Sequence, residues 1–212
     1  MSVELAVRSS RRNPTRPQPR GEERRSRLLN ALTRHLDTQS LAEVSVASVA
    51  EEAGLARSAF YFYFSSKNEA VTYLLAEIFD AQIAEATTVL GRVGDPRENL
   101  SRVLHSTVQS WISQRSRFIA MLDARDADAE ARGRWESWLN RYEEFVASYI
   151  DEHLTPGRHP VPDSRDLAHS LISMNERVLE RHMRGHGLAT AEDVHRSLVH
   201  VWTATIFGSV TP

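Results

Sequence analysis

The sequence predicts an all-α protein built from about nine helices, and the placement of proline is the first reason. The eight prolines leave three long proline-free stretches, 20–95, 97–155 and 163–211, and a proline inside a helix costs about 3 kcal/mol or more. Within these stretches apolar residues recur every three or four positions, which is the spacing of one helical face. The strand-like run of aromatics at 60–64 has no partner strand elsewhere in the chain.

The element boundaries follow from residues that start and stop helices. Residues 1–20 hold five arginines, three prolines and one acid, so we expect a disordered basic arm. Glycines supply breaks at 54, at 91 and 94, and within the turn 184–187, whereas Gly133 lies inside the seventh helix and costs it up to about 1 kcal/mol. The helices are predicted near 22–37, 46–53, 57–63, 67–90, 96–114, 116–125, 128–153, 163–183 and 191–207.

Composition and charge narrow the class of protein. The chain of 212 residues is 41% hydrophobic and 25% charged, and it has no cysteine, which is typical of globular chains. No apolar run approaches a membrane span, and the basic N-terminus lacks the apolar block of a secretory signal, so we expect a cytoplasmic protein without membrane contact. Residues 1–67 carry 11 Arg and Lys against 7 Asp and Glu, and residues 68–212 carry 15 against 21. A basic module joined to an acidic remainder favours nucleic-acid binding.

The second and third helices form a predicted helix-turn-helix. Ser45 and Ser48 have the right chemistry to cap the second helix. Its apolar stripe is Val46, Val49, Ala50 and Ala53. Gly54 suits the left-handed turn that ends it, and the third helix starts near Arg57.

The third helix has two chemically different faces. At 100° per residue Phe60 and Phe64 share a face suited to the core, and the residues at 58, 59, 62 and 63 lie on the other. The outer face suits DNA: small side chains approach base edges, arginine reaches guanine, and tyrosine hydroxyls and Lys67 bind phosphates. The candidate DNA contacts are Ser45, Val46, Arg57, Ser58, Ala59, Tyr61, Phe62, Tyr63 and Lys67. The alternative is that the aromatics only pack a three-helix core.

Residues 45–71 resemble the DNA-binding signature of the TetR family of transcriptional regulators. The likeness rests on Val49-Ala50, Ala53-Gly54, Tyr61, Phe64 and Ser66-Lys67, while Ala56 departs from the Ser or Thr that usually caps the recognition helix. Segments 174–179 and 198–208 resemble the EthR-like subgroup of that family. The resemblance implies a basic arm at 1–20, a helix-turn-helix domain at 21–67 and a ligand-binding and dimerisation domain at 68–212. It also implies a homodimeric repressor that binds double-stranded palindromic operator DNA and is released by a small hydrophobic ligand.

The C-terminal part carries more aromatic bulk than a helical body of its size needs, which favours an apolar pocket. The candidate lining residues are Val108, Trp111, Ile112, Trp138, Tyr142, Phe145, Asn175, Glu176 and Trp202. The resemblance implies that Asn175 bonds the ligand, although Ile172 and Glu180 depart from the pocket residues of the subgroup. Two alternatives stay open: the aromatics are ordinary core, or Asn175 and Glu176 form an exposed pair.

The last two helices carry a second apolar surface, which the resemblance implies is the dimer interface. Its residues are Leu167, Leu171, Met174, Val178, Val194, Leu198, Val201, Ile206 and Phe207. A dimer also suits DNA recognition, because one short helix reads few base pairs and two-fold symmetry pairs two half-sites. The same residues could instead belong to the core of one chain.

Enzyme signatures are missing from the sequence, so neither a catalytic site nor a cofactor is predicted. His182 and His186 have the spacing of two zinc ligands, but no adjacent glutamate or third ligand accompanies them. The charged run 123–134 is interpreted as a solvated helix junction. A small helical enzyme or carrier that uses the C-terminal cavity remains the competing hypothesis.

Overall fold

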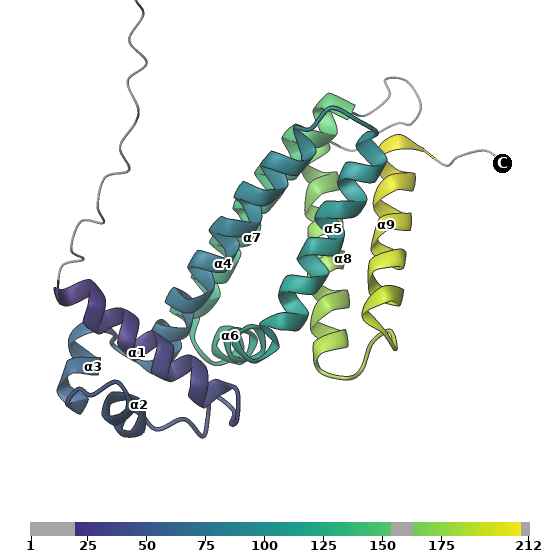
Figure 1. Ribbon diagram of the computed structural model, residues 1–212. Helices are drawn as coiled ribbons and strands as arrows, with labels where there is room; N and C mark the ends of the chain where they lie inside the picture. Colours follow the sequence, from purple (N-terminus) through teal and green to yellow (C-terminus); the bar gives the residue numbers. More distant parts are fainter. Residues whose placement is uncertain (1–19, 154–162, 209–212) are drawn as a thin grey trace, which may run out of the picture.

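The computed structural model describes residues 20–153 and 163–208, and those residues form nine α-helices without a strand (Figure 1). The helices are α1 (Arg20–Leu36), α2 (Val46–Glu52), α3 (Arg57–Tyr63), α4 (Lys67–Leu90), α5 (Pro96–Ser113), α6 (Arg115–Ala127), α7 (Ala129–His153), α8 (Ser164–Met183) and α9 (Ala191–Phe207). The predicted fold class is therefore confirmed, with each boundary within two residues of its prediction. The predicted basic arm lies outside the described residues, except for Arg20.

The helices are arranged as a small unit and a larger body (Figure 1). Helices α1, α2 and α3 lie together at one end, and α4 leaves this unit and packs along α7. Helices α5, α8 and α9 form the far side of the body, while α6 crosses its lower end and contacts α1. A single cluster of buried side chains extends from Leu28 in α1 to Ile206 in α9. Because the core is continuous, a displacement in the body can reach the small unit.

Local sequence signals account for the starts of five of the nine helices in the described residues. The side chains of Ser45, Ser66, Asp95, Asp163 and Thr190 accept hydrogen bonds from amides in the first turns of α2, α4, α5, α8 and α9, as N-cap residues do. The cap at Ser45 is the longest, with 3.5 Å between its Oγ and the amide nitrogen of Ser48.

Glycine conformation explains the sharp turn between α2 and α3. Gly54 has a φ of 67°, a left-handed conformation in which a side chain would be strained. Gly133 lies on the exposed side of α7, and a Cβ placed there would meet nothing within 4 Å. Helix α7 therefore continues through it, and the penalty is limited to the weak helix propensity of glycine.

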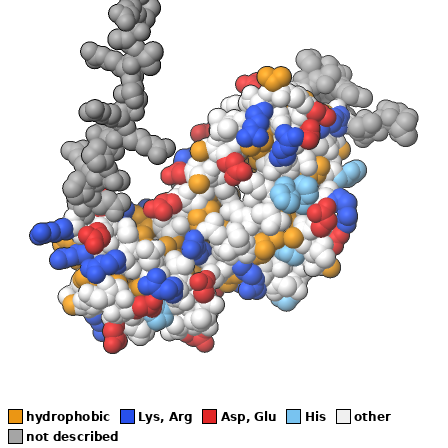
Figure 2. Space-filling model, in the orientation of Figure 1, with side chains coloured by type: hydrophobic (Ala, Val, Ile, Leu, Met, Phe, Trp, Pro, Cys, Tyr) orange, Lys and Arg blue, Asp and Glu red, His pale blue; other side chains and the backbone are white. Residues whose placement is uncertain are grey.

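The surface of the small unit is rich in basic side chains. Figure 2 shows Lys and Arg side chains gathered over α1–α3, with Asp and Glu among them. No helix in the described part of the chain is long and apolar enough to cross a membrane.

Candidate nucleic-acid interface and apolar cavity

Helix α3 presents an apolar inner face and an exposed outer face, as its sequence predicts. Phe60 and Phe64 are each only 1% exposed and pack against each other with ring centroids 5.3 Å apart. On the other side Phe62 is 82% exposed and Tyr61 is 47% exposed. Two aromatics are thus core, while two others lie on the protein surface.

Tyr63 does not share the exposure of Phe62, contrary to the prediction that both are exposed aromatics. It is partly buried against the core cluster, and its hydroxyl lies beside Gly21 in the first turn of α1. The helical-wheel argument placed both rings on one face but could not include α1, which covers part of that face. The hydroxyl remains close to the arginine-rich start of α1.

Arg57 lies at the start of α3, and its guanidinium group packs against Tyr61. The guanidinium carbon is 5.6 Å from the centroid of the Tyr61 ring, and Nη2 is 3.5 Å from the hydroxyl oxygen, which is a weak contact. Ala56 precedes the helix and offers no side-chain cap. The absence of the Ser or Thr cap that the sequence indicated at this position is therefore confirmed. The amide of Ala59 donates to the carbonyl oxygen of Ala56 at 2.9 Å, which leaves the amides of Arg57 and Ser58 to solvent or a ligand.

Lys67 begins α4 and is held by backbone groups of the segment before α2. Its Nζ donates to the carbonyl oxygens of Ala42 at 2.8 Å and Val44 at 3.2 Å. An ammonium group has three N–H donors, so one remains for a phosphate. Lys67 therefore braces the helix-turn-helix as well as carrying charge, a role that depends on contacts distant in sequence.

The larger body contains an apolar cavity of about 80 Å³. Its walls are Phe79, Gln82, Ala86, Leu90, Leu100, Val103, Leu104, Thr107, Trp111, Trp135, Leu139, Tyr142, Phe145, Val146, Tyr149, Ile172, Asn175, Glu176, Leu179 and Trp202. Pockets that hold drug-sized ligands measure roughly 300–1,000 Å³. This cavity must therefore widen before it can hold such a molecule.

Six of the nine predicted lining residues lie in the cavity wall: Trp111, Tyr142, Phe145, Asn175, Glu176 and Trp202. The other three do not line the cavity. Val108 is fully buried and Ile112 packs against the core cluster. Trp138 stacks on Phe79, with centroids 4.8 Å apart, and so supports the wall from behind. Helical spacing identifies the inward face but does not distinguish a wall residue from one packed behind it.

Helix α4 supplies part of the wall, which was missed at the sequence level. Phe79, Gln82, Ala86 and Leu90 line the cavity, and they recur at three or four positions along one helical face. That periodicity was visible in the sequence, and α4 could have been recognised from it. Trp135 was also missed as a lining residue; its indole is fully buried and its ring lies 6.2 Å from that of Trp111.

Asn175 and Trp202 form a buried polar pair in the wall. The indole Nε1 of Trp202 donates to Oδ1 of Asn175 at 2.9 Å. Trp202 is 3% exposed and Asn175 is 8% exposed. The indole N–H is only a donor, so it fixes the amide with its oxygen toward Trp202. Nδ2 has no hydrogen-bond partner among the described residues, which leaves an amide donor at the cavity.

Glu176 links the cavity to α6. Its Oε1 accepts hydrogen bonds from Nη1 of Arg125 at 2.6 Å and from Nε1 of Trp135 at 3.0 Å. Burial raises the pKa of Glu176, and the hydrogen bond from Trp135 and the charge of Arg125 oppose that rise. Since Asn175 and Glu176 are both largely buried, the alternative of an exposed pair is wrong.

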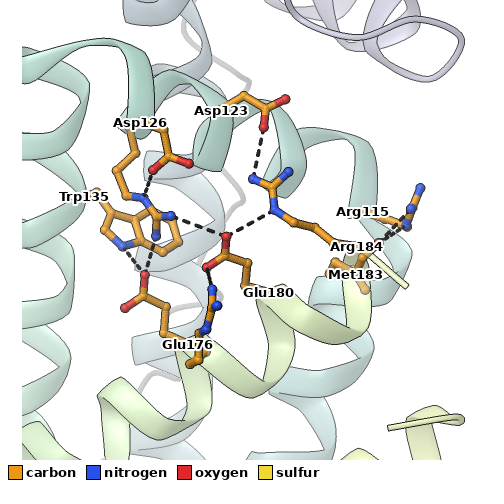
Figure 3. Close-up of polar contacts among 10 residues, drawn as sticks. Arg115, Asp123, Asp126, Trp135, Glu176, Glu180, Met183 and Arg184 are labelled. Carbon is orange, nitrogen blue, oxygen red and sulfur yellow. Dashed lines mark hydrogen bonds and ion pairs between the residues drawn. The ribbon is translucent and has the colours of Figure 1, made fainter. Parts of the chain in front are cut away.

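Glu180 lies one turn further along α8 and extends the ion pairs into a network (Figure 3). Its carboxylate is 3.5 Å from Arg125, 3.3 Å from Arg177 and 3.1 Å from Arg184. Arg184 also pairs with Asp123 of α6 at 3.0 Å. The network therefore joins α6 to the C-terminal half of α8.

The same region corrects the interpretation of residues 123–134 as solvated. The segment does contain the α6–α7 junction, and Asp126 is exposed. The Arg125 side chain, however, is only 16% exposed because it reaches the buried carboxylates of Glu176 and Glu180. Burial lowers the pKa of Arg125, but the hydrogen bond and charge of Asp126, together with the two glutamates, outweigh it and raise the pKa overall.

The predicted dimer surface divides into core and surface residues. Leu171, Val194, Leu198 and Ile206 are buried within the single chain, so four of the nine residues belong to the intrachain core because α8 and α9 pack on α7 and α5. The five that remain partly exposed are Leu167, Met174, Val178, Val201 and Phe207.

Comparisons with known proteins match both parts of this architecture. Residues 28–72 match the family model of bacterial regulatory proteins of the TetR family, and residues 100–208 match the C-terminal domain of the transcriptional regulator EthR. The HTH-type transcriptional regulator EthR of Mycolicibacterium smegmatis is 30% identical over 200 residues, covering 91% of this chain and 90% of the relative. The chain belongs to the TetR family, in its EthR branch.

A second EthR sequence and two solved structures are also similar to this TetR-family regulator, the structures in fold alone. EthR of Mycobacterium tuberculosis is 29% identical over 194 residues, covering 90% of each chain. A TetR-family regulator structure from Syntrophomonas wolfei has a TM-score of 0.72 at 17% identity, covering 90% of this chain and 99% of that one. One from Mesorhizobium loti has a TM-score of 0.69 at 14% identity, covering 89% and 98%. The matched relatives are transcriptional regulators and not enzymes.

In the described part of this TetR-family regulator, no group of three or more His, Cys, Asp or Glu side chains is placed to hold a metal ion. The Nδ1 atom of His182 lies 2.8 Å from the carbonyl oxygen of Leu188 and closes the turn after α8. Gly185, with a φ of 76°, shapes that turn.

Proposed function

We propose that this regulator is a homodimeric repressor that binds a palindromic operator and is released by a small hydrophobic ligand. In this proposal residues 21–67 bind DNA, and residues 68–212 bind the ligand and the second subunit. The outer face of α3 enters the major groove, with Arg57, Ser58 and Ala59 at base edges. Tyr61, Tyr63 and Lys67 contact phosphates, and Ser45 and Val46 lie at the start of the supporting helix.

The observation that carries the proposal is the path of α4. The helix has 24 residues and therefore spans about 36 Å. Its first residue, Lys67, braces the helix-turn-helix, and its side chains from Phe79 to Leu90 line the cavity. One rigid element thus connects the DNA-binding unit directly with the ligand cavity.

The small volume of the cavity supports release by expansion. A ligand that fits only after the walls separate must displace one or more of α4, α5, α7 and α8, because these four helices supply all the lining residues except Trp202. Movement of α4 shifts the recognition helix, and movement of α8 pulls on α6 through Arg125. The linkage is reciprocal: a ligand that weakens DNA binding is itself bound more weakly by the DNA-bound dimer, and a coupling of 1–3 kcal/mol gives about 5- to 150-fold.

DNA binding tests the first part of the proposal. Duplex fragments from the region flanking the protein's own gene are titrated with the full-length protein, and binding is measured by fluorescence anisotropy. We expect specific binding that the Arg57→Ala variant loses, because the guanidinium is exposed at the groove-facing end of α3. The control variant Arg165→Ala removes an exposed charge at the start of α8 and should keep full affinity.

Ligand binding tests the second part. A thermal-shift screen of neutral apolar compounds should find stabilisers of the wild-type protein that no longer act on the Trp202→Ala variant. Those compounds should also release DNA. If apolar compounds bind but no DNA is bound specifically, the result supports the carrier hypothesis. If DNA is bound specifically but no compound depends on Trp202, the cavity is not the ligand site.

A further inference from the structure

The most exposed aromatic side chain of the described residues lies in the last turn of α3, one residue before the helix ends. Phe62 is 82% exposed, and Tyr61, at 47%, is the only other aromatic among the exposed large hydrophobic residues. Exposed phenylalanine leaves apolar area in water that a contact would remove favourably. Phe62 therefore requires an explanation that core packing does not give.

Phe62 is the large side chain of a stripe whose other members are small. Ser58 and Ala59 precede it by four and three residues, so the three side chains share one stripe of α3. Ser58 and Ala59 are small, and the ring is supported at its side by an edge-to-face contact with Tyr63, with centroids 5.0 Å apart and planes at 87°. The ring therefore stands beside two small side chains and is accessible to a groove that α3 approaches.

The chemistry of the ring limits what it can recognise there. A phenyl group neither donates nor accepts a conventional hydrogen bond, so it can bind neither a phosphate nor the polar edge of a base. The apolar group that the major groove offers is the C5-methyl of thymine, which protein methyl and phenyl groups contact. On the adjacent stripe of α3, the guanidinium group of Arg57 packs against Tyr61. The positive charge of Arg57 attracts the helix to DNA.

We propose that Phe62 is a specificity-determining residue that reads the C5-methyl group of one thymine in each operator half-site. The inference rests on the proposed DNA-binding function and adds the base feature that the ring recognises. Arg57 supplies the polar contact and Phe62 the apolar one, so the half-site contains a thymine within reach of the base that Arg57 contacts.

The test removes the methyl group and the ring separately and together. An operator is first selected from a pool of random duplexes with the full-length protein. Each thymine is then replaced by deoxyuridine, which lacks only the methyl group. At one position per half-site we expect wild-type affinity to fall about fourfold, and about 15-fold when both half-sites are changed, from the loss of one buried methyl per site. For the Phe62→Ala variant, the same replacements should change the operator affinity by less than about 1.5-fold.

Matched variants separate this contact from a general loss of structure. Val93 is also fully exposed, in the α4–α5 connection, and the Val93→Ala variant should keep the full thymine dependence. Since Phe62 is exposed, Phe62→Ala should keep the wild-type melting temperature, and Phe62→Leu should retain part of the dependence.

The outcomes distinguish the proposal from the function on which it rests. If no sequence is enriched, the DNA-binding function itself fails. If an operator is found but no thymine is sensitive, or if wild-type and Phe62→Ala proteins lose the same affinity with deoxyuridine, Phe62 does not read the methyl group. Equal weakening of every sequence by Phe62→Ala would assign the ring to the sugar-phosphate backbone and would also overturn the proposal.

Discussion

Ala56 lies before a recognition helix of only seven residues, α3, and leaves its first amides without a side-chain acceptor. The neighbouring helices α2 and α4 each begin with a serine that accepts such a hydrogen bond. Because short helices depend strongly on their ends, position 56 has more influence on α3 than its surface location suggests.

We predict that Ala56→Ser stabilises the protein by about 1 kcal/mol, the usual contribution of an N-cap. The free energy of unfolding, measured by urea denaturation, should rise by that amount. The control Ala81→Ser places serine on the exposed side of α4, within the helix, and should be neutral or slightly destabilising. An unchanged or lower stability for Ala56→Ser would show that the α3 amides already have adequate partners.

Single residues also show where sequence reasoning stops. The inward direction of Phe60 and Phe64 followed from local geometry alone, since Phe64 directly follows α3 and its amide donates to the carbonyl oxygen of Phe60. The partial burial of Tyr63 depends on α1, and the two carbonyl contacts of Lys67 depend on the segment before α2. Residue properties set by a local period were therefore predictable, and those set by a distant segment were not.

At the scale of elements, α6 and α8 are joined by buried charge. Arg125 contacts Glu176 and Glu180, whose side chains are 19% and 8% exposed. Removing one partner from such a group leaves the others desolvated without compensation, which is more costly than losing a surface ion pair. The helix boundaries were predictable from prolines, caps and glycines, but this connection was not, because charged residues in a sequence give no sign of their burial.

A double-mutant cycle measures the connection between the two helices. We predict that Arg125→Met lowers the free energy of unfolding by about 2–3 kcal/mol and that adding Glu180→Met recovers part of it, with a coupling energy above about 1 kcal/mol. The control pair is Arg134 and Glu130, an exposed i, i+4 pair on α7, whose coupling should stay below about 0.5 kcal/mol. Additive effects at Arg125 and Glu180 would mean that the network holds no energy between α6 and α8.

At the scale of the whole molecule, the assembly depends on the outer faces of α8 and α9. Met174 on α8 and Val201 on α9 are partly exposed apolar residues outside the buried set. We predict that Met174→Glu with Val201→Glu yields a monomer by light scattering, because four carboxylates would otherwise be buried across a two-fold axis.

The monomer should bind its operator at least about tenfold more weakly than the dimer, since each subunit then binds one half-site alone. The control Leu188→Glu changes an exposed residue in the α8–α9 turn and should remain dimeric. A dimer that persists in the doubly substituted protein would place the interface elsewhere.

The last prediction concerns the cavity. A side chain that fills the cavity should weaken DNA binding in the same way as a bound ligand. Thr107 lines the cavity from α5, and Thr107→Phe adds a ring to a space of about 80 Å³ that cannot hold it without movement of the walls. We predict that operator affinity falls about 5- to 150-fold, the range of typical allosteric coupling, while the protein stays folded and dimeric. Val93→Phe adds the same ring outside the cavity and should leave the affinity unchanged. If Thr107→Phe binds DNA as tightly as the wild type, expansion of the cavity does not move the recognition helices, and ligand release must act by another route.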